Sequence, residues 1–107
     1  LTKDMGNLDF TRPAVELERL IRGLNPWPSA YTGLDGKILK IWAADVCEEE
    51  QAGAACGEIV KVSKDAVYVA CGQGVLKITE LQLQGKKRMD TAAFLRGYHV
   101  EKGVRME

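Results

Sequence analysis

The sequence has few of the side chains from which enzyme sites are usually built. It contains one histidine, His99, and three cysteines, Cys47, Cys56 and Cys71. The spacing of the cysteines matches neither a paired-thiol redox motif nor a zinc ribbon. A thiol nucleophile would need a partner base, and His99 has no visible collaborator in the sequence. We therefore expect no metal site and no catalytic centre in this chain, and cysteines that stay reduced in a cytoplasm.

Long hydrophobic runs and an excess of charge are also missing. No apolar run approaches the roughly 20 residues that span a bilayer, and no secretory leader pattern opens the chain. These absences predict a soluble, cytoplasmic protein that does not bind membranes. The 15 basic and 15 acidic residues cancel, so no global field attracts nucleic acid, and such binding would require a local patch. With 107 residues, of which 46% are hydrophobic, the chain is suited to one compact core.

The apolar spacing predicts an initial helix followed by strands. Thr11 is a candidate N-cap, and Pro13 suits a first helical turn. Leu17 and neighbouring apolar residues recur at helical spacing up to Gly23, where the left-handed conformation would end the helix. Alternation and turn signals then predict strands and a second, short helix capped by Asp90. The expected strands cover residues 37–46, 58–62, 66–71, 75–84 and, as a final edge, 98–106; the short helix covers 90–96.

The strand at 75–84 changes its apolar phase, from Leu76 and Ile78 to Leu81 and Leu83. An extra residue near position 79 or 80, as in a β-bulge, would return both pairs to one face and bend the strand. Such bends help a short sheet to curl. The predicted fold is therefore mainly β: a small OB-like antiparallel β-barrel with an N-terminal helix and a short C-terminal helix.

Basic residues are concentrated near the C-terminus: between residues 86 and 105, six cations oppose Asp90 and Glu101, giving +6 − 2 = +4. Cations on a loop and an adjoining helix can follow a phosphate backbone without reading sequence. A run of bases on a turn is also common solvated surface, so both readings stay open. The RNA-binding candidates are Lys86, Lys87, Arg88, Arg96, Lys102 and Arg105, with Lys3 and Arg22 as a possible second strip.

Several strings resemble one family in order along nearly the whole chain. They are residues 20–32 (LIRGLNPWPSAYT), 36–42 (GKILKIW), 57–59 (GEI), 71–76 (CGQGVL), 81–89 (LQLQGKKRM) and 94–97 (FLRG). They resemble the C-terminal domain of methionyl-tRNA formyltransferase. The family's catalytic motifs, a Ser-Leu-Leu-Pro segment and an Asn, a His and an Asp, do not occur. The resemblance implies residues 1–10 as the remnant of an interdomain linker and 11–107 as the OB-like domain.

The resemblance also implies a function in translation initiation. The domain would help to bind and orient initiator methionyl-tRNA, and its second partner would be the enzyme's own N-terminal catalytic domain. That absent domain would use 10-formyltetrahydrofolate, and this fragment alone, without a cofactor, should be inactive.

Two alternatives remain. The chain could be a structural clamp for the catalytic domain, using Phe10, the first helix and Trp27, with little RNA contact. It could also belong to a related sugar-nucleotide or formyl-folate enzyme. We expect Trp27 to be a buried plug between helix and sheet, and the aromatic residues in general to serve packing.

Overall fold

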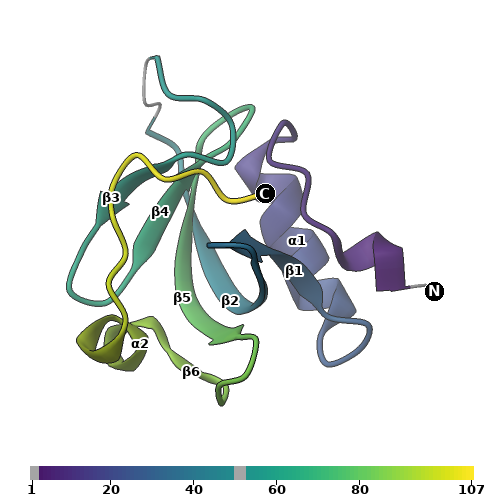
Figure 1. The fold of residues 1–107 in the computed structure, drawn as a ribbon. Helices are drawn as coiled ribbons and strands as arrows, with labels where there is room; N and C mark the ends of the chain where they lie inside the picture. The colour runs from purple at the N-terminus through teal and green to yellow at the C-terminus, as the bar shows by residue number, and fades with distance from the viewer. Residues whose placement is uncertain (1–2, 50–52) are drawn as a thin grey trace.

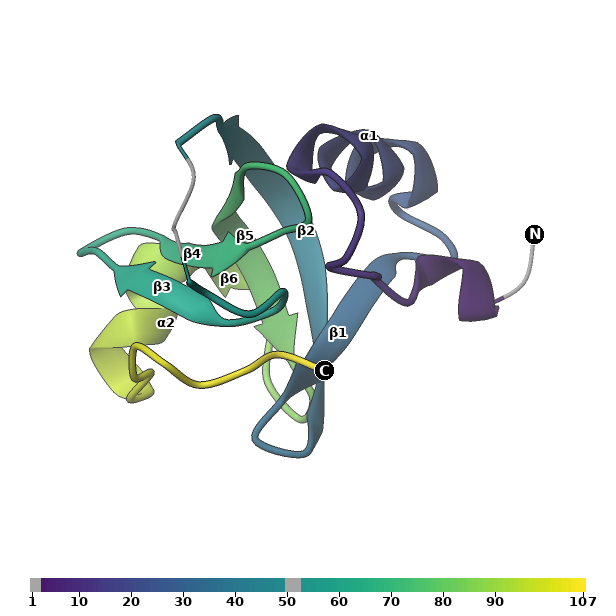
Figure 2. The same cartoon turned by 90° about the horizontal axis from the view of Figure 1, so that it is seen from above.

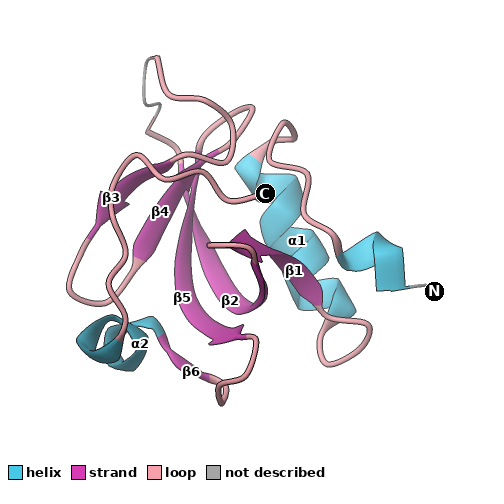
Figure 3. Ribbon diagram, in the orientation of Figure 1, coloured by secondary structure: helices cyan, strands magenta, loops and turns pink. Residues whose placement is uncertain are grey.

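A computed structural model describes residues 3–49 and 53–107, which form one twisted sheet, two α-helices and a short 3-10 helix (Figures 1 and 3). The elements are, in order, η1 (Lys3–Gly6), α1 (Ala14–Leu24), β1 (Ala30–Leu34), β2 (Lys37–Cys47), β3 (Ile59–Val62), β4 (Val67–Ala70), β5 (Val75–Leu83), β6 (Met89–Asp90) and α2 (Thr91–Gly97). The predicted mainly β class is confirmed, and so are the strands expected at 37–46, 58–62, 66–71 and 75–84. The strand β1, from which the chain enters β2, was not expected.

The sheet is antiparallel and open, with the strand order β1-β2-β5-β4-β3 and β6 paired with β5. The sheet is curled but is not closed into a barrel. Figure 2 shows the strong curl of the sheet, with β1 and β3 at its two edges and the C-terminal tail between them. The tail was expected to form an edge strand. It makes an isolated bridge between Glu58 and Arg105, and the Glu107 amide donates to the Gly33 carbonyl at 3.1 Å. Three backbone hydrogen bonds join residues 103–106 to residues 57–59, whereas a single one joins the tail to β1.

The predicted bulge lies on β5. Ile78 pairs with Ala44 and Glu80 pairs with Ala43, so Thr79 is the extra residue on this strand. A second shift leaves Trp42 as the extra residue on β2. Leu76, Ile78, Leu81 and Leu83 are all buried as a result. The change of apolar phase in the sequence thus has the physical cause that the pattern indicated.

The helix α1 covers the sheet with its apolar face, which buries Ala14, Leu17, Ile21 and Leu24. Two expectations about its ends are wrong. The N-cap is Pro13 and not Thr11, whose hydroxyl instead donates to Asp9 at 2.6 Å. The helix also passes through Gly23 and ends before Asn25 in extended backbone. The left-handed residue of this corner is Ser29, with a φ of 76°.

The helix α2 begins as predicted. Asp90 accepts a hydrogen bond from the Ala93 amide at 2.7 Å and caps the first turn. Thr91 is fully buried, and its hydroxyl donates to the Ile78 carbonyl at 3.1 Å, which ties the helix to β5 beside the bulge. The start of α2 therefore has a defined position relative to the turn between β5 and β6.

The described part of the segment before α1 packs onto the domain. Leu8 and Phe10 are each 6% exposed and belong to the main core. The Leu8 amide donates to the Tyr31 carbonyl at 2.9 Å. Because Phe10 is buried within its own domain, it is not available to hold a second domain, as the clamp alternative had required.

Candidate nucleic-acid interface

The turn between β5 and β6, residues 84–88, carries the first three candidate cations at the foot of the sheet in Figure 1. Gly85 has a φ of 86°, which permits the tight reversal. The Lys86 amide donates to the Leu83 carbonyl at 2.8 Å and closes the turn. Lys86 and Lys87 are exposed, and neither makes an ion pair with any residue in the described ranges. Their charges therefore face solvent uncompensated.

Arg88 is in a different situation, because it is held by two neighbours. Its Nε lies 2.6 Å from a carboxylate oxygen of Glu80, and its guanidinium carbon lies 4.2 Å from the centre of the Trp42 ring. The hydrogen bond that the Arg88 guanidinium donates to Glu80 raises the pKa of Arg88 above its ordinary value. Arg88 is thus a charged group whose charge is largely neutralised, and only the two lysines remain free in this turn.

A chain of hydrogen bonds fixes the shape of the turn. The Trp42 indole nitrogen donates to the Gln82 side-chain oxygen at 3.2 Å, and the Gln82 amide nitrogen donates to the Lys86 carbonyl at 3.1 Å. Asn25, at the end of α1, donates to the Trp42 carbonyl at 3.0 Å. The backbone that carries the two lysines is therefore tied to the sheet, which lowers the entropy lost when a ligand binds.

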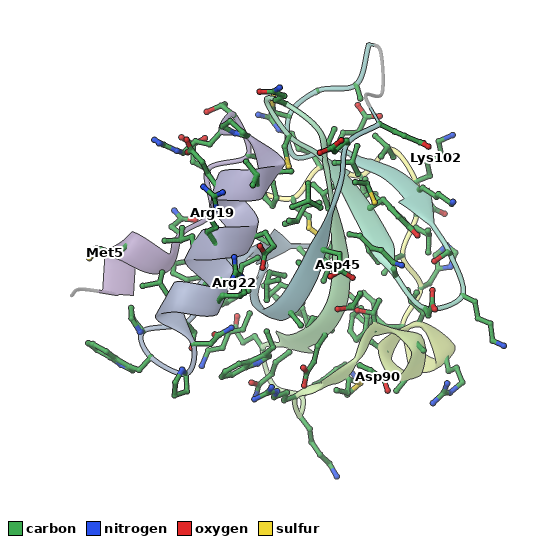
Figure 4. The ribbon with its side chains drawn as sticks, turned by 180° about the vertical axis from the view of Figure 1, so that it is seen from behind. Met5, Arg19, Arg22, Asp45, Asp90 and Lys102 are labelled. Atoms are coloured by element: carbon green, nitrogen blue, oxygen red, sulfur yellow. The ribbon has the colours of Figure 1, made fainter. Side chains whose placement is uncertain are left out.

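The other candidates do not join this turn in one patch. Figure 4 shows Asp90 at the foot of the sheet and Lys102 near its opposite end. Arg96 borders a separate cleft that also includes Lys64 and His99. The backbone of Arg105 forms an isolated β-bridge with Glu58 next to β3. Its Nε lies 3.8 Å from a carboxylate oxygen of Glu107. The expected single cationic segment is thus divided, because the tail turns away along β3.

The second candidate strip, Lys3 and Arg22, also offers less free positive charge than the sequence indicated. Arg22, labelled on α1 in Figure 4, is exposed but makes an ion pair with Glu18 one turn earlier. Lys3 belongs to η1, and its side chain lies outside the described part of the chain. Arg19, the other labelled cation of α1, is exposed and has no ion pair within residues 3–49 and 53–107.

The expected burial of the two tryptophans is wrong for Trp27, and it is only partial for Trp42, which lies outside the hydrophobic core. Trp27 is 60% exposed and does not plug the corner. Trp42 is half-buried against Arg88 and Gln82. Tyr98 stacks on Phe94 with the ring centres 4.8 Å apart. Its hydroxyl donates to Asp35, whose carboxylate raises the pKa of Tyr98.

Lysines on the strands form a further cationic row, outside the candidates named from the sequence. Lys61, Tyr68 and Lys77 lie opposite one another on β3, β4 and β5, and both ammonium groups approach the Tyr68 ring, at 4.9 and 6.0 Å. Lys40 on β2 faces Gln82 on β5. Simple alternation along a strand was the only signal for these residues, and any half-exposed strand produces it.

No group of three or more His, Cys, Asp or Glu side chains within residues 3–49 and 53–107 is arranged to hold a metal ion. The three cysteines are unbridged. No helix among these residues has the length and apolar character needed to cross a membrane.

Comparison with known proteins confirms the resemblance carried by the sequence strings. The family model described as "Formyl transferase, C-terminal domain" matches residues 1–99. The chain belongs to this family. It is 55% identical over 108 residues to the methionyl-tRNA formyltransferase of Lachnospira eligens, covering 97% of the chain and 34% of that protein. It is 55% identical over 103 residues to the same enzyme of Agathobacter rectalis, covering 96% and 33%. The chain thus spans about a third of the length of these relatives.

Solved structures support the fold. A crystal structure of HypX from Aquifex aeolicus in complex with tetrahydrofolic acid is similar with a TM-score of 0.67, at 19% identity. The match covers 91% of the chain and 17% of HypX. A HypX variant is similar with a TM-score of 0.68, at 21% identity and 91% coverage of the chain, against 18% of that protein. At such identities the likeness establishes the architecture of this formyltransferase C-terminal domain and not its ligand.

Proposed function

We propose that this C-terminal domain helps a methionyl-tRNA formyltransferase to bind and orient initiator methionyl-tRNA, while the formyl transfer takes place in a preceding catalytic domain. The observation that carries the proposal is the rigid β5–β6 turn, which presents Lys86 and Lys87 without a neutralising carboxylate in the described ranges. The relatives at 55% identity bear the name of this tRNA-modifying enzyme. They favour a tRNA substrate over a sugar nucleotide or formyl-folate.

The chemistry of the turn suits a phosphate backbone. Two ammonium groups on adjacent residues can each approach a phosphate oxygen and displace condensed counterions. Such contacts position a nucleic acid without reading its bases. Orientation of the aminoacyl end would then lower the entropic part of the barrier in the preceding domain. Cytoplasmic location and use of 10-formyltetrahydrofolate by that domain are parts of the same proposal.

Charge reversal tests the proposal. We expect Lys86→Glu/Lys87→Glu to weaken binding of initiator tRNA to the chain by about 10-fold or more at low salt, since two phosphate contacts become repulsive. The control is Lys61→Glu/Lys64→Glu, which makes the same change of charge at β3 and its turn. Equal losses in both variants, or no loss in the first, would refute contact through the β5–β6 turn.

A further inference from the structure

An exposed aromatic surface lies where α1 meets β1. Trp27 and Ile38 are 60% and 50% exposed, although both are large apolar side chains. Together with Tyr31 they border a cavity of 550 Å³. Contiguous apolar exposure of this kind marks interaction sites in soluble proteins. We call this region the Trp27 surface; it is lined by Pro26, Trp27, Pro28, Ser29, Tyr31, Ile38 and Lys40.

The Trp27 surface is built rigidly. The Ser29 hydroxyl donates to the Pro26 carbonyl at 2.8 Å, and the Ser29 amide donates to the Leu24 carbonyl at 3.0 Å. Gly6 lies so close beneath that an added Cβ would stand 2.0 Å from the Ser29 carbonyl oxygen. The loop is therefore held from both sides, and Trp27 is presented with little conformational freedom to lose on binding.

The N-terminal segment passes directly beside this surface. Asn7 forms a bridge with Tyr31, and the Leu8 amide donates to the Tyr31 carbonyl at 2.9 Å. The relatives are about three times as long as this chain, which matches a C-terminal domain family. We propose that the Trp27 surface is the docking site of the domain that precedes residue 1 in the parent protein.

Size and charge favour this occupant. A separate protein partner would need roughly 1,200 Å² or more of total buried surface for a stable interface. A tethered domain is present at an effective concentration of about millimolar, so a small patch with one aromatic anchor suffices. Lys40 is the only charged residue among those lining the cavity. One cation is a poor match for a phosphate backbone, which distinguishes this surface from the β5–β6 turn.

Hydroxyl-radical footprinting with mass spectrometry tests the proposal in the full-length parent protein and in the 107-residue chain, both without RNA. We expect the reactivity of Trp27 to fall roughly sixfold in the parent, as its exposure drops from 60% to about a tenth. His99, whose side chain is 81% exposed on the tail, is the internal control and should react equally in both. Equal reactivity of Trp27 in both proteins would overturn the proposal.

Other occupants give different results. Protection of Trp27 that requires tRNA would overturn the proposal in favour of an RNA contact. Protection in the 107-residue chain that increases with its concentration would overturn it in favour of self-association. Neither result depends on whether Lys86 and Lys87 bind RNA, so the two proposals can fail independently.

A matched pair of substitutions adds a functional readout. Trp27→Ala should leave the thermal midpoint of the 107-residue chain unchanged and lower that of the parent. The control is Val15→Ala, at a residue 41% exposed on α1. This substitution should shift the thermal midpoint of the parent by the same small amount as that of the 107-residue chain. An unchanged midpoint of the parent with Trp27→Ala would contradict docking at this surface.

Discussion

Glu80 neutralises part of the positive charge of the candidate RNA surface by pairing with Arg88. Its replacement should therefore strengthen RNA binding. Glu80 lies on β5 and pairs with Arg88 at 2.6 Å; their side chains are 33% and 51% exposed. The substitution Glu80→Gln removes the negative charge that pairs with Arg88 and leaves Arg88 over the Trp42 ring. At this exposure the ion pair contributes little to stability, so the fold should persist.

The expected effect follows from counterion release. One additional phosphate contact steepens the dependence of log K on log salt by about 0.7 to 0.9. Between 50 and 200 mM salt, a fourfold change, the variant should therefore lose about threefold more affinity than the original chain. At the lowest salt it should bind more tightly than the original chain. Fluorescence anisotropy of labelled initiator tRNA at four salt concentrations measures both quantities.

The control for this prediction is Glu101→Gln, which makes the same change in net charge. Glu101 pairs with His99 on the tail, away from the β5–β6 turn. If both variants gain the same affinity and slope, the effect comes from net charge alone. An unchanged slope in Glu80→Gln would refute the reasoning that Arg88 becomes available to a phosphate.

Three further predictions concern stability. Asp90→Ala removes the cap of α2 and should lower the free energy of unfolding by about 1 kcal/mol in urea denaturation, whereas an unchanged midpoint would deny the cap. Gly33→Ala should destabilise the domain because a Cβ would stand 1.9 Å from the Glu107 carbonyl oxygen. Gly23→Ala, with open space around it in α1, should instead stabilise the domain by about 0.5 to 1 kcal/mol. A change of the same sign in both variants would contradict the structure. Asp35 raises the pKa of Tyr98, so the protonated phenol stabilises the fold below pH 10.0, its ordinary pKa, and this stability is lost as pH rises through the folded value. In thermal melts at pH 9 to 11, the melting temperature should therefore fall less steeply with pH for Tyr98→Phe than for the original chain. Identical slopes of melting temperature against pH would refute the interaction.

Local pattern was sufficient to predict the parts of the fold that depend on one face being buried. The phase change around Thr79 had a single physical solution, because Leu76, Ile78, Leu81 and Leu83 cannot reach one core without an extra residue. The cap at Asp90 was equally local. Both features depend on residues close in sequence, where alternation and side-chain chemistry act directly.

Barrel closure and the exposure of Trp27 depend on distant contacts. Nothing near the tail indicates that it would meet β1 through one hydrogen bond at Gly33 and not through a ladder. Trp27 has the size of a core residue, but the path of the loop through Ser29 leaves its ring outside. Tertiary geometry decides such cases, and hydrophobicity alone does not.

The sequence was sufficient to identify the cations of the candidate site. It was not sufficient to predict which of them lie together in the structure. The run 86–88 was visible as three bases, yet the pairing of Arg88 with Glu80 arises because β6 lies against β5. The separation of Lys102 and Arg105 from the turn likewise follows from the course of the tail beside β3. Charge counted along the chain therefore overestimated the cationic surface.

The most direct test of the central claim is the chemical reactivity of each lysine with and without initiator tRNA. Acetylation followed by mass spectrometry compares the free lysines of the β5–β6 turn with those elsewhere on the sheet. The account predicts that tRNA protects Lys86 and Lys87 and leaves Lys64 and Lys102 reactive. Protection of Lys64 or Lys102 with Lys86 and Lys87 still reactive would contradict it.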